Sequence, residues 1–457
     1  MKTDIVIIGA GLTGLTTAYR LARKGRNVMV VELLDHVGGQ IQTHQEGGFV
    51  FESGPNTGVV ANPEVAELMA DLEQTSGGKC RLETAPDASK RRLIWKNGQF
   101  HDLPSGPISA VTTPLFTFGD KLRILGEPWR PKGNNPDESV GSLARRRLGK
   151  SFVDYAVDPF LSGVYAGNPD TLITRYALPK LYDLEQQYGS FIRGAIAKAR
   201  QPKSHREQLA TKKVFSAAGG LSRIIKSMAD HLGSQHIVLG AKKTMVMPLE
   251  DGWSVTYINK EGEKEEILCS KVVTTCAAYE LPELLPFINN EDMGHLSNLT
   301  YAPVVEISVG VNDTHGGDYH AFGGLIPSCE RKKVLGILFP SACFNGRAPE
   351  GGALFSYFIG GMQNAELIEK SDAELTALVE EYFHTMLKFP THVSPDLIRI
   401  FRHKRGIPQY EITTGDRLDT VKRLQERHPG LIIAGNLRDG IGMAHRIKQA
   451  TDIANQI

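Results

Sequence analysis

The hydrophobic pattern at the start of the chain predicts a strand, a helix and a second strand. Residues 5–8 form a continuous, β-branched apolar run, which is typical of a buried parallel strand. Apolar residues then recur at helical spacing over 12–24, and Gly25 is a natural helix stop. Residues 28–31 repeat the buried-strand pattern and end at Glu32. This order predicts a βαβ unit of a parallel sheet.

The turn between the first strand and the helix carries the motif G-x-G-x-x-G at Gly9, Gly11 and Gly14. The first glycine permits a tight turn, the second permits backbone to approach a pyrophosphate, and the third permits close packing of helix on strand. Glu32 lies where an acid can accept a hydrogen bond from a ribose 2′-hydroxyl. It would repel a 2′-phosphate, which disfavours NADP as the ligand. A fortuitous glycine turn is the alternative. The predicted dinucleotide contacts are Gly9, Ala10, Gly11, Leu12, Thr13, Gly14, Glu32 and Leu33.

Patterns in the middle of the chain predict an insert of strands and helices. Residues 92–100 read as a hairpin with an Asn97-Gly98 turn. Ser139 is a candidate N-cap for a helix that Gly149 stops, and we interpret the arginines at 145–147 as a solvated face of that helix.

Further along the chain, residues 198–213 are basic and polar, which indicates an exposed loop or helix end. Strand-like runs follow over 300–360, and residues 372–388 look helical.

Composition narrows the class of protein. A chain of 457 residues is too long for one ordinary core, so two or three domains are expected. A formal net charge of +1 disfavours nucleic-acid binding, for which a basic domain is expected. The five cysteines are scattered without a CxxC pair, so neither a disulfide framework nor a metal site follows.

Hydropathy bears on location. No signal peptide and no apolar run of about 18 residues is found, so a cytoplasmic protein is expected. Peripheral contact with the inner face of the cell membrane stays open, although residues 100–200 show no strongly apolar exposed stretch.

Two stretches distinguish FAD from NAD. Gly38-Gly39 resemble the extra glycine pair of flavoproteins of the amine-oxidase and glutathione-reductase type, and "FVFESGP" resembles the strand that enters their Gly-Pro turn near the flavin. A plain loop is the alternative for the glycine pair alone. Residues 429–457 resemble the C-terminal FAD segment, where a helix N-terminus favours an anion. The resemblance implies noncovalent FAD held also by Gly38, Gly39, Gln40, Gly54, Pro55, Asn56, Thr57, Val246, Ala277, Gly435, Asn436, Ile441, Gly442 and Met443.

The inserted part resembles one family, the oxygen-dependent protoporphyrinogen oxidases. The resemblance rests on "ESVGSLARRRLG", "GVYAGNP", "VFSAAGGLSRI", "AFGGLIPS", "VLGILF" and "IPQY", in order along the whole chain. It implies oxidation of protoporphyrinogen IX to protoporphyrin IX in haem biosynthesis, with dioxygen as acceptor and hydrogen peroxide as product. A sister branch acts on coproporphyrinogen III instead. The alternatives are a flavin amine oxidase or carotenoid desaturase, and a non-catalytic flavin protein that partners a neighbouring haem-pathway enzyme.

The resemblance also implies an architecture. The fold class is α/β, α+β overall, with a Rossmann-type FAD-binding domain built from both chain ends (1–90, 210–280 and 405–457). A helical subdomain over 100–205 is the candidate for membrane contact. A substrate-binding mixed sheet takes residues 91–99 and 281–404. Monomer and homodimer are both compatible with the family.

The expected substrate site is an apolar slot formed by residues 321–328 and 334–339. Leu325 would pack on the flat macrocycle, and Gly323 and Gly324 would permit close approach; ordinary sheet core is the alternative. The predicted substrate contacts are Gly167, Gly323, Gly324, Leu325 and Leu338. Catalytic residues stay unassigned, because the hard chemistry of such enzymes belongs to the flavin.

The chain departs from the family at two places. Ile108 stands at or near the position of an arginine that pairs with a substrate propionate in some relatives, which leaves Arg92, Lys121, Arg123 and Arg347 as candidates. His445 and Arg446 stand where relatives carry Asp-Cys, and both are expected on a helix surface. The C-terminal segment also lacks the aromatic residues and the cysteine typical of amine oxidases.

Overall fold

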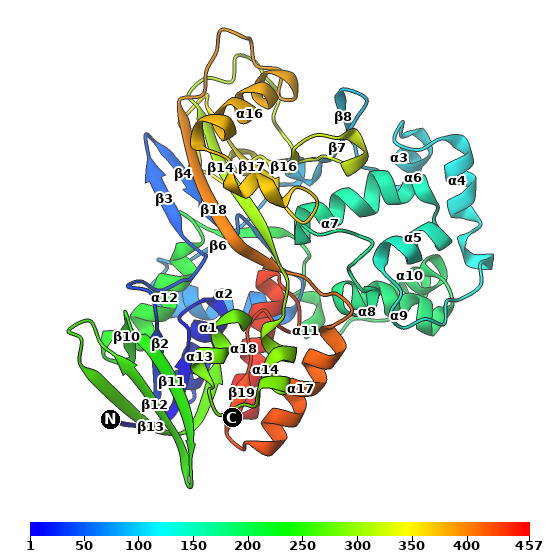
Figure 1. Ribbon diagram of the computed structural model, residues 1–457. Helices are drawn as coiled ribbons and strands as arrows, with labels where there is room; N and C mark the ends of the chain where they lie inside the picture. Colours follow the sequence, from blue (N-terminus) through cyan, green and yellow to red (C-terminus); the bar gives the residue numbers. More distant parts are fainter.

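The computed structural model describes the backbone of residues 1–457 and the side chains of all of them except Ala88 and Pro107. The chain forms two seven-stranded sheets, two smaller sheets and a group of helices beside them (Figure 1). This mixture, with a parallel Rossmann-like core in the first sheet, confirms the predicted fold class.

The first sheet contains the predicted βαβ unit. Its strand β1 (Lys2–Ile8) pairs in parallel with β2 on one side and with β13 on the other. The strands in order are β10 (Ile237–Leu239), β2 (Val28–Glu32), β1 (Lys2–Ile8), β13 (Lys264–Thr274), β12 (Gly252–Ile258) and β11 (Lys242–Leu249). The last part of β13 pairs in parallel with β19 (Leu431–Ile433), so the C-terminal segment joins the N-terminal sheet.

Helices cover both sides of this sheet. One core lies under α1 (Leu12–Arg23), α2 (Pro63–Thr75), α12 (Ser222–Leu232) and α18 (Met443–Gln456). The other lies among β11, β12 and the helices α13 (Leu281–Leu284), α14 (Asn290–Ser297) and α17 (Thr414–Arg427). Residues 281–297 were expected with the substrate sheet, but α13 packs on β11 and α14 on α17, because their apolar side chains complete this second core.

The second sheet lies above the first in Figure 1. Its strands in order are β18 (Leu397–Pro408), β14 (Tyr301–Val311), β17 (Ala353–Gly360), β16 (Val334–Leu338), β15 (Gly323–Leu325), β7 (Arg92–Lys96) and β8 (Gln99–Asp102). Alternate residues of β14, β16 and β17 form a core with α16 (Asp372–Thr385), so the sheet's other face looks toward the glycine-rich unit.

Short elements complete the fold as two small sheets and one helical turn between β16 and β17. They are β3 (Thr43–Glu46) with β4 (Phe49–Glu52), β5 (Gly58–Val59) with β9 (Val214–Ala217) and β6 (Leu82–Thr84), and α15 (Pro340–Cys343).

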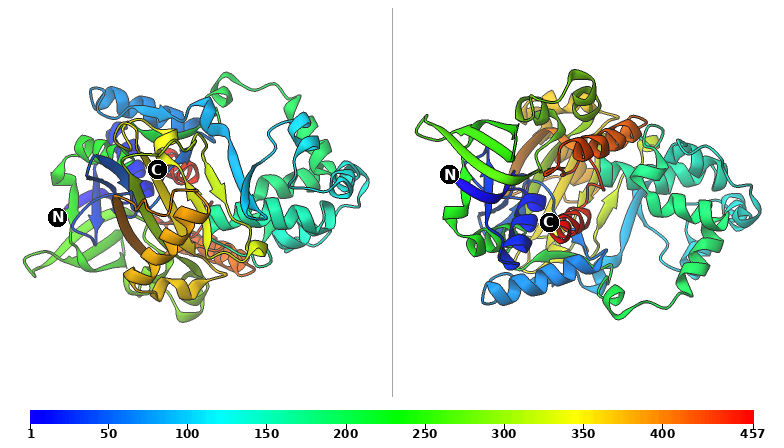
Figure 2. Two further views of the ribbon diagram at one scale, coloured as in Figure 1. Left: turned by 90° about the horizontal axis from the view of Figure 1, so that it is seen from above. Right: turned by 90° about the horizontal axis from the view of Figure 1, so that it is seen from below.

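Most of the remaining helices gather at one side of the molecule in both views of Figure 2. They are α3 (Pro107–Thr112), α4 (Phe118–Leu125), α5 (Val140–Arg147), α6 (Lys150–Phe152), α7 (Asp158–Tyr165), α8 (Thr174–Ala177), α9 (Pro179–Tyr188) and α10 (Phe191–Ala199). The short α11 (His205–Gln208) lies against α2, where Arg206 pairs with Glu64 and Glu67.

Several local predictions are confirmed. The turn at Asn97 and Gly98 has positive φ at both residues and joins β7 to β8, as a two-residue hairpin requires. Ser139 caps α5 by accepting a hydrogen bond from the Ser142 amide. Residues 200–213 are almost all exposed, with only the short α11 inside them.

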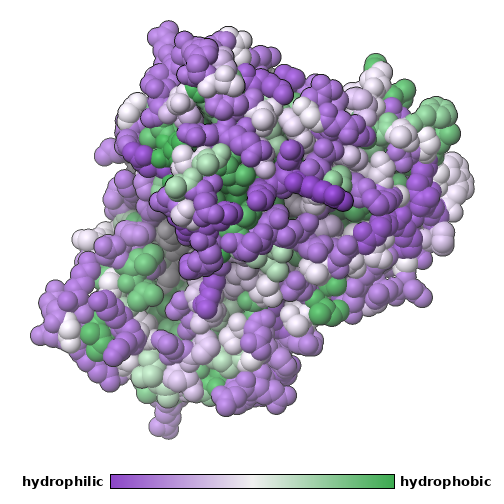
Figure 3. Space-filling view, turned by 45° about the horizontal axis from the view of Figure 1, so that its top comes forward, coloured by the Kyte–Doolittle hydropathy of each residue, from purple (hydrophilic) through white to green (hydrophobic). Residues whose placement is uncertain are grey.

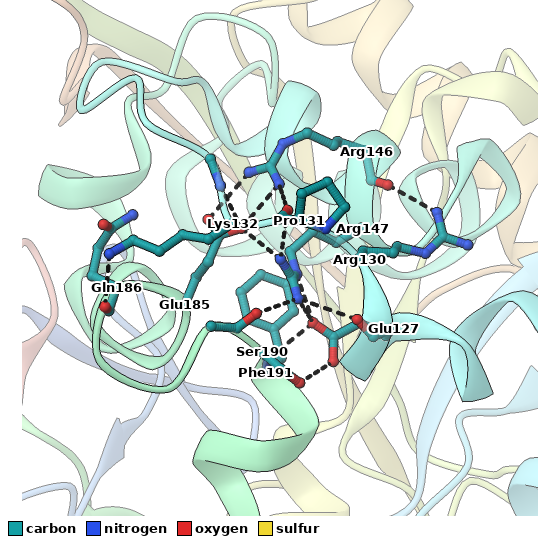
Figure 4. A network of polar contacts seen from close by, with 12 residues as sticks. Glu127, Arg130, Pro131, Lys132, Arg146, Arg147, Glu185, Gln186, Ser190 and Phe191 are labelled. Atoms are coloured by element: carbon teal, nitrogen blue, oxygen red, sulfur yellow. Dashed lines mark hydrogen bonds and ion pairs between the residues drawn. The ribbon is translucent and has the colours of Figure 1, made fainter.

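The interpretation of 145–147 as a solvated face is wrong for Arg147, whose side chain is 0% exposed (Figure 4). Its Nε donates to Glu127 at 2.6 Å and its Nη1 to Glu185 at 2.7 Å. Glu127 also accepts from Ser190 and from backbone amides at the start of α10. Burial opposes the charge of Glu127, but these hydrogen bonds outweigh it and lower its pKa. The cluster therefore ties α5, α9 and α10 together.

A second correction concerns the surface of the helical part. Six large apolar side chains on and around α3 and α4 are exposed, and Figure 3 shows apolar atoms at the surface of this side of the molecule. They are Ile108 (83%), Val111 (72%), Phe118 (76%), Leu122 (52%), Leu125 (66%) and Trp129 (79%), which we call the apolar patch. The sequence pattern did not reveal it, because these residues are spread over 22 positions and interrupted by polar ones.

The buried ion cluster makes a testable prediction. Arg147→Leu leaves Glu127 and Glu185 buried without their cation, so we expect a loss of about 3–5 kcal/mol in the stability of the helical part. Arg145→Leu is the matched control: it breaks a half-exposed pair with Asp170 and should cost about 0–1 kcal/mol. Thermal unfolding of both variants measures the difference, and equal midpoints would contradict the assignment.

Candidate functional site

Four segments that are distant in sequence meet at one edge of the first sheet. Because β1, β2, β13 and β19 are parallel neighbours, their carboxyl ends lie together. The loops that leave this edge carry the glycine motif, Leu33, Ala277 and the Gly435-Asn436 turn. In open α/β sheets this is the edge at which ligands bind.

The three motif glycines have distinct surroundings. Gly9 has φ of +103°, which a residue with a side chain rarely adopts. A Cβ on Gly14 would collide with the Gly9 carbonyl oxygen, so this glycine is needed for packing of α1 on β1. A Cβ on Gly11 would have no atom within 4 Å, and Gly11 is the N-cap of α1 with no side chain capping the helix. The helix N-terminus is thus open to an anion.

Glu32 fixes the geometry of this loop. Its Oε2 accepts from the Ala10 amide at 2.6 Å, and its Oε1 accepts from the Leu34 amide at 2.8 Å. The side chain is buried, whereas Leu33 beside it is 53% exposed. Each carboxylate oxygen retains a second lone pair for a ribose hydroxyl.

The second glycine pair lies against the first motif and against the Gly-Pro turn. A Cβ on Gly39 would lie 3.6 Å from the Cα of Gly11, and one on Gly54 would collide with the Gln40 carbonyl oxygen. Residues 38–40 therefore connect the first motif to residues 54–57. Asn56 in that turn donates to Glu306 of β14, so the turn reaches the second sheet.

The C-terminal loop forms the other wall. Asn436 has a buried Oδ1 without a hydrogen-bond partner among the described residues, and Gly442, the N-cap of α18, offers no side-chain cap. Ile441 and Gly442 are partly or fully exposed, and Met443 is buried. Tyr410 holds the loop, donating to the Asn436 carbonyl at 3.0 Å and accepting from the Gly440 amide at 2.9 Å.

Arg446 is a residue that sequence reasoning placed wrongly. It is 6% exposed and not on a helix surface; His445 beside it is exposed. Its guanidinium donates to the carbonyls of Gly435 and Arg438, and burial lowers its pKa to about 10. It faces inward because α18 packs one side of its first turn against α1 and the loop, while His445 lies on the other side. Arg446 thus braces the Gly435 turn from behind.

The side chain of Val246 on β11 is fully buried in the core between the first sheet and α13, so it does not itself face the open edge.

The open face of the second sheet carries part of the predicted apolar slot. Leu325, Leu338 and Phe358 are partly exposed there, on neighbouring strands. Gly323 pairs with Leu338, and a Cβ on Gly323 would collide with the backbone of β16. Gly324 does not belong to this face: strand alternation turns it to the α16 side, where a Cβ would collide with Phe100.

The two more specific motif stretches of the insert contact each other. Gln409 of "IPQY" donates to the Tyr165 carbonyl at 2.8 Å, and the rings of Tyr165 and Tyr410 lie 6.4 Å apart. Gly167 is buried here, where a Cβ would meet Gln409 Oε1 at 2.6 Å. Gly167 therefore packs between the end of α7 and Gln409, a role that the sequence could not distinguish from a ligand contact.

The four cationic residues predicted as candidates to bind a substrate carboxylate differ in burial and in their hydrogen-bond partners. Arg347 is buried and paired with Glu52. Lys121 and Arg123 donate to backbone carbonyls of the helical part. Arg92 begins β7 beside Gly323, is exposed, and lies 5.5 Å from the Phe322 ring centroid. Arg92 is the candidate that lies on the open face of the second sheet.

These residues fit an extended dinucleotide. The open Cβ position at Gly11 and the uncapped start of α1 suit a pyrophosphate, and the unpartnered Asn436 Oδ1 supplies an acceptor for a hydroxyl. The path from Gly11 through Gly39 to residues 54–57 then ends under the second sheet.

Comparisons with known proteins agree with this site. A model of the family described as flavin containing amine oxidoreductase matches residues 12–446. The chain is similar to protoporphyrinogen oxidase 1, chloroplastic, of Arabidopsis thaliana, with 30% identity over 100% of this chain and 88% of that one. It is similar to coproporphyrinogen III oxidase of Bacillus subtilis (strain 168), with 25% identity over 98% and 96%.

A solved structure from Exiguobacterium sp. 255-15, named for protoporphyrinogen oxidase, has a TM-score of 0.80 and 22% identity over 99% of this chain and 98% of that one. At this identity the likeness shows the fold. Together with the family match, these findings make FAD the cofactor, as expected.

The motif glycines provide a matched pair of variants. Gly11→Ala adds a methyl group in open space, so we expect an apo-protein that melts like wild type but binds FAD at least tenfold more weakly, since the methyl enters the pyrophosphate position. Gly14→Ala should instead lower the melting temperature of the apo-protein, because its Cβ meets the Gly9 carbonyl. Fluorescence titration with FAD and thermal unfolding separate the two, and unchanged FAD affinity in Gly11→Ala would refute the placement.

Proposed function

The chain belongs to the flavin-containing amine oxidoreductase family, and on that premise we propose that it oxidises protoporphyrinogen IX to protoporphyrin IX in haem biosynthesis, with dioxygen as electron acceptor and hydrogen peroxide as product. The enzyme is an FAD-dependent oxidoreductase. Coproporphyrinogen III is the second candidate substrate, because a relative named for its oxidation aligns with 98% of the chain.

The observation that carries the proposal is a group of partly exposed apolar side chains on the face of the second sheet that also contacts Asn56. Leu325, Leu338 and Phe358 are apolar, partly exposed and on neighbouring strands, which suits a hydrophobic macrocycle. Bound FAD supplies the hydride acceptor. The chain's own residues orient the macrocycle, exclude water and hold the flavin-side turn against the sheet.

The proposal is tested by adding protoporphyrinogen IX or coproporphyrinogen III to FAD-loaded protein in air. We expect porphyrin fluorescence to rise faster than autoxidation, together with hydrogen peroxide, and neither to rise before air is admitted. Amine substrates serve as the control for the wider family. Fluorescence no faster than autoxidation on both porphyrinogens would refute the proposed function.

We assign a substrate carboxylate to Arg92. A charge-assisted hydrogen bond contributes about 1.5–3 kcal/mol, so Arg92→Gln should raise KM at least tenfold with little change in kcat. Arg123→Gln removes an exposed arginine of the helical part and should leave KM unchanged. Steady-state kinetics on both variants decide, and a KM in Arg92→Gln equal to that of wild type would exclude Arg92.

Among the described residues, no helix is long and apolar enough to cross a bilayer. We propose that the apolar patch instead docks on a membrane surface. Six outward apolar side chains are flanked by Lys121, Arg123 and Arg130, a combination that suits anionic lipid.

Vesicle co-sedimentation tests this proposal. Replacing both Phe118 and Trp129 by Ser should weaken binding to phosphatidylglycerol-containing vesicles at least about a hundredfold, since each large side chain contributes about 1.5–3 kcal/mol when buried. Ile196→Ser, an exposed change on α10, is the control and should bind as wild type. Equal sedimentation of all three proteins would contradict the proposal.

A further inference from the structure

Glu306 places a carboxyl group in the face of the second sheet that meets the flavin-side turn. It is 1% exposed on β14, between Phe358 of β17 and Phe401 of β18. Its Oε1 accepts from Asn56 Nδ2 at 2.5 Å, and within the described part of the chain no ion pair involves it. A carboxyl group buried without a cation needs a reason, because its burial is costly.

The hydrogen bonds of Asn56 supply that reason. Its Nδ2 also donates to the Gly54 carbonyl at 3.1 Å, and its Oδ1 accepts from Ser356 Oγ at 2.8 Å. Since the Gly54 carbonyl only accepts, the amide has one orientation. Asn56 therefore joins the turn to two strands of the sheet, with Glu306 on one side and Ser356 on the other.

A second hydrogen bond from the sheet fixes the start of the same turn. His403 Nε2 of β18 donates to the Ser53 carbonyl at 2.7 Å. Two neighbouring strands thus fix residues 53–56 at both ends, directly where the path from Gly11 through Gln40 arrives. Burial, reinforced by the nearby Glu52 and opposed by the Asn56 hydrogen bond, raises the pKa of Glu306 well above its ordinary value.

We propose that Glu306 is a positioning residue of the FAD site. Through the amide of Asn56 it fixes the position of residues 53–57 relative to the flavin. The inference rests on the FAD site of the proposed function and not on the identity of the substrate. Because Glu306 acts as an acceptor, a glutamine can replace it, whereas an apolar side chain of similar size cannot.

The test compares purified holo-proteins. Glu306→Leu removes the acceptor, and we expect FAD to bind about tenfold more weakly and the visible absorption bands of the bound flavin to shift. Glu306→Gln keeps an acceptor oxygen and should restore both within about twofold. Val309→Ala is the control on the opposite face of β14: it should lower the melting temperature but leave the flavin spectrum and FAD affinity as in wild type.

A double-mutant cycle tests the route through Asn56. If Glu306 acts through that amide, adding Glu306→Leu to Asn56→Ala should change FAD affinity no further. Should Glu306→Leu fail to fold, Ser356→Ala removes the hydrogen bond that Asn56 Oδ1 accepts and is expected to shift the same bands.

Two results would overturn the inference: a Glu306→Leu protein that loses only thermal stability, as Val309→Ala does, or effects of the two substitutions that add. Neither readout requires a porphyrinogen, so this inference and the proposed reaction fail separately.

Discussion

The rest of the structure depends on the hydrogen-bond pairing of β13. This strand has neighbours on both sides, and its two halves pair with different strands. Its first half pairs with β12 in an antiparallel hairpin, and its second half lies between β1 and β19 in parallel. Parallel neighbours must end at one edge, so this single strand brings the start, the middle and the end of the chain to the same place. The cofactor edge follows from that pairing, although its residues are more than 400 positions apart.

Around this edge, buried polar groups fix the conformation of the loops, because the loops have too few apolar side chains to form a packed core. Glu32 ties the Ala10 and Leu34 amides, Arg446 ties two carbonyls of the C-terminal loop, and Glu306 ties Asn56. Each is buried and each binds backbone or an amide rather than an opposite charge. Such groups cost free energy to bury, and they specify one arrangement of loops that carry few apolar side chains.

How much the sequence could predict depended on the range of the interactions involved. The glycine motif, the Asn97-Gly98 turn and the Ser139 cap were predictable, because each is decided by residues within one turn of the chain. The orientation of Gly324 and Arg446 depends on which face of a sheet or helix finds a partner. Arg147 is similar: its partners lie 20 and 38 positions away, and no local pattern separates it from the exposed Arg145.

The same cluster explains why the helical part can expose its apolar side chains. A helix of globular proteins normally turns its apolar residues inward, since burial is what holds it. Here α5, α9 and α10 are joined by Arg147, Glu127 and Glu185, so part of the cohesion comes from buried charges. In α4, by contrast, no residue is buried, and Phe118, Leu122 and Leu125 face outward. Cohesion by ion pairs thus leaves the apolar residues of α3 and α4 free to meet a surface outside the molecule.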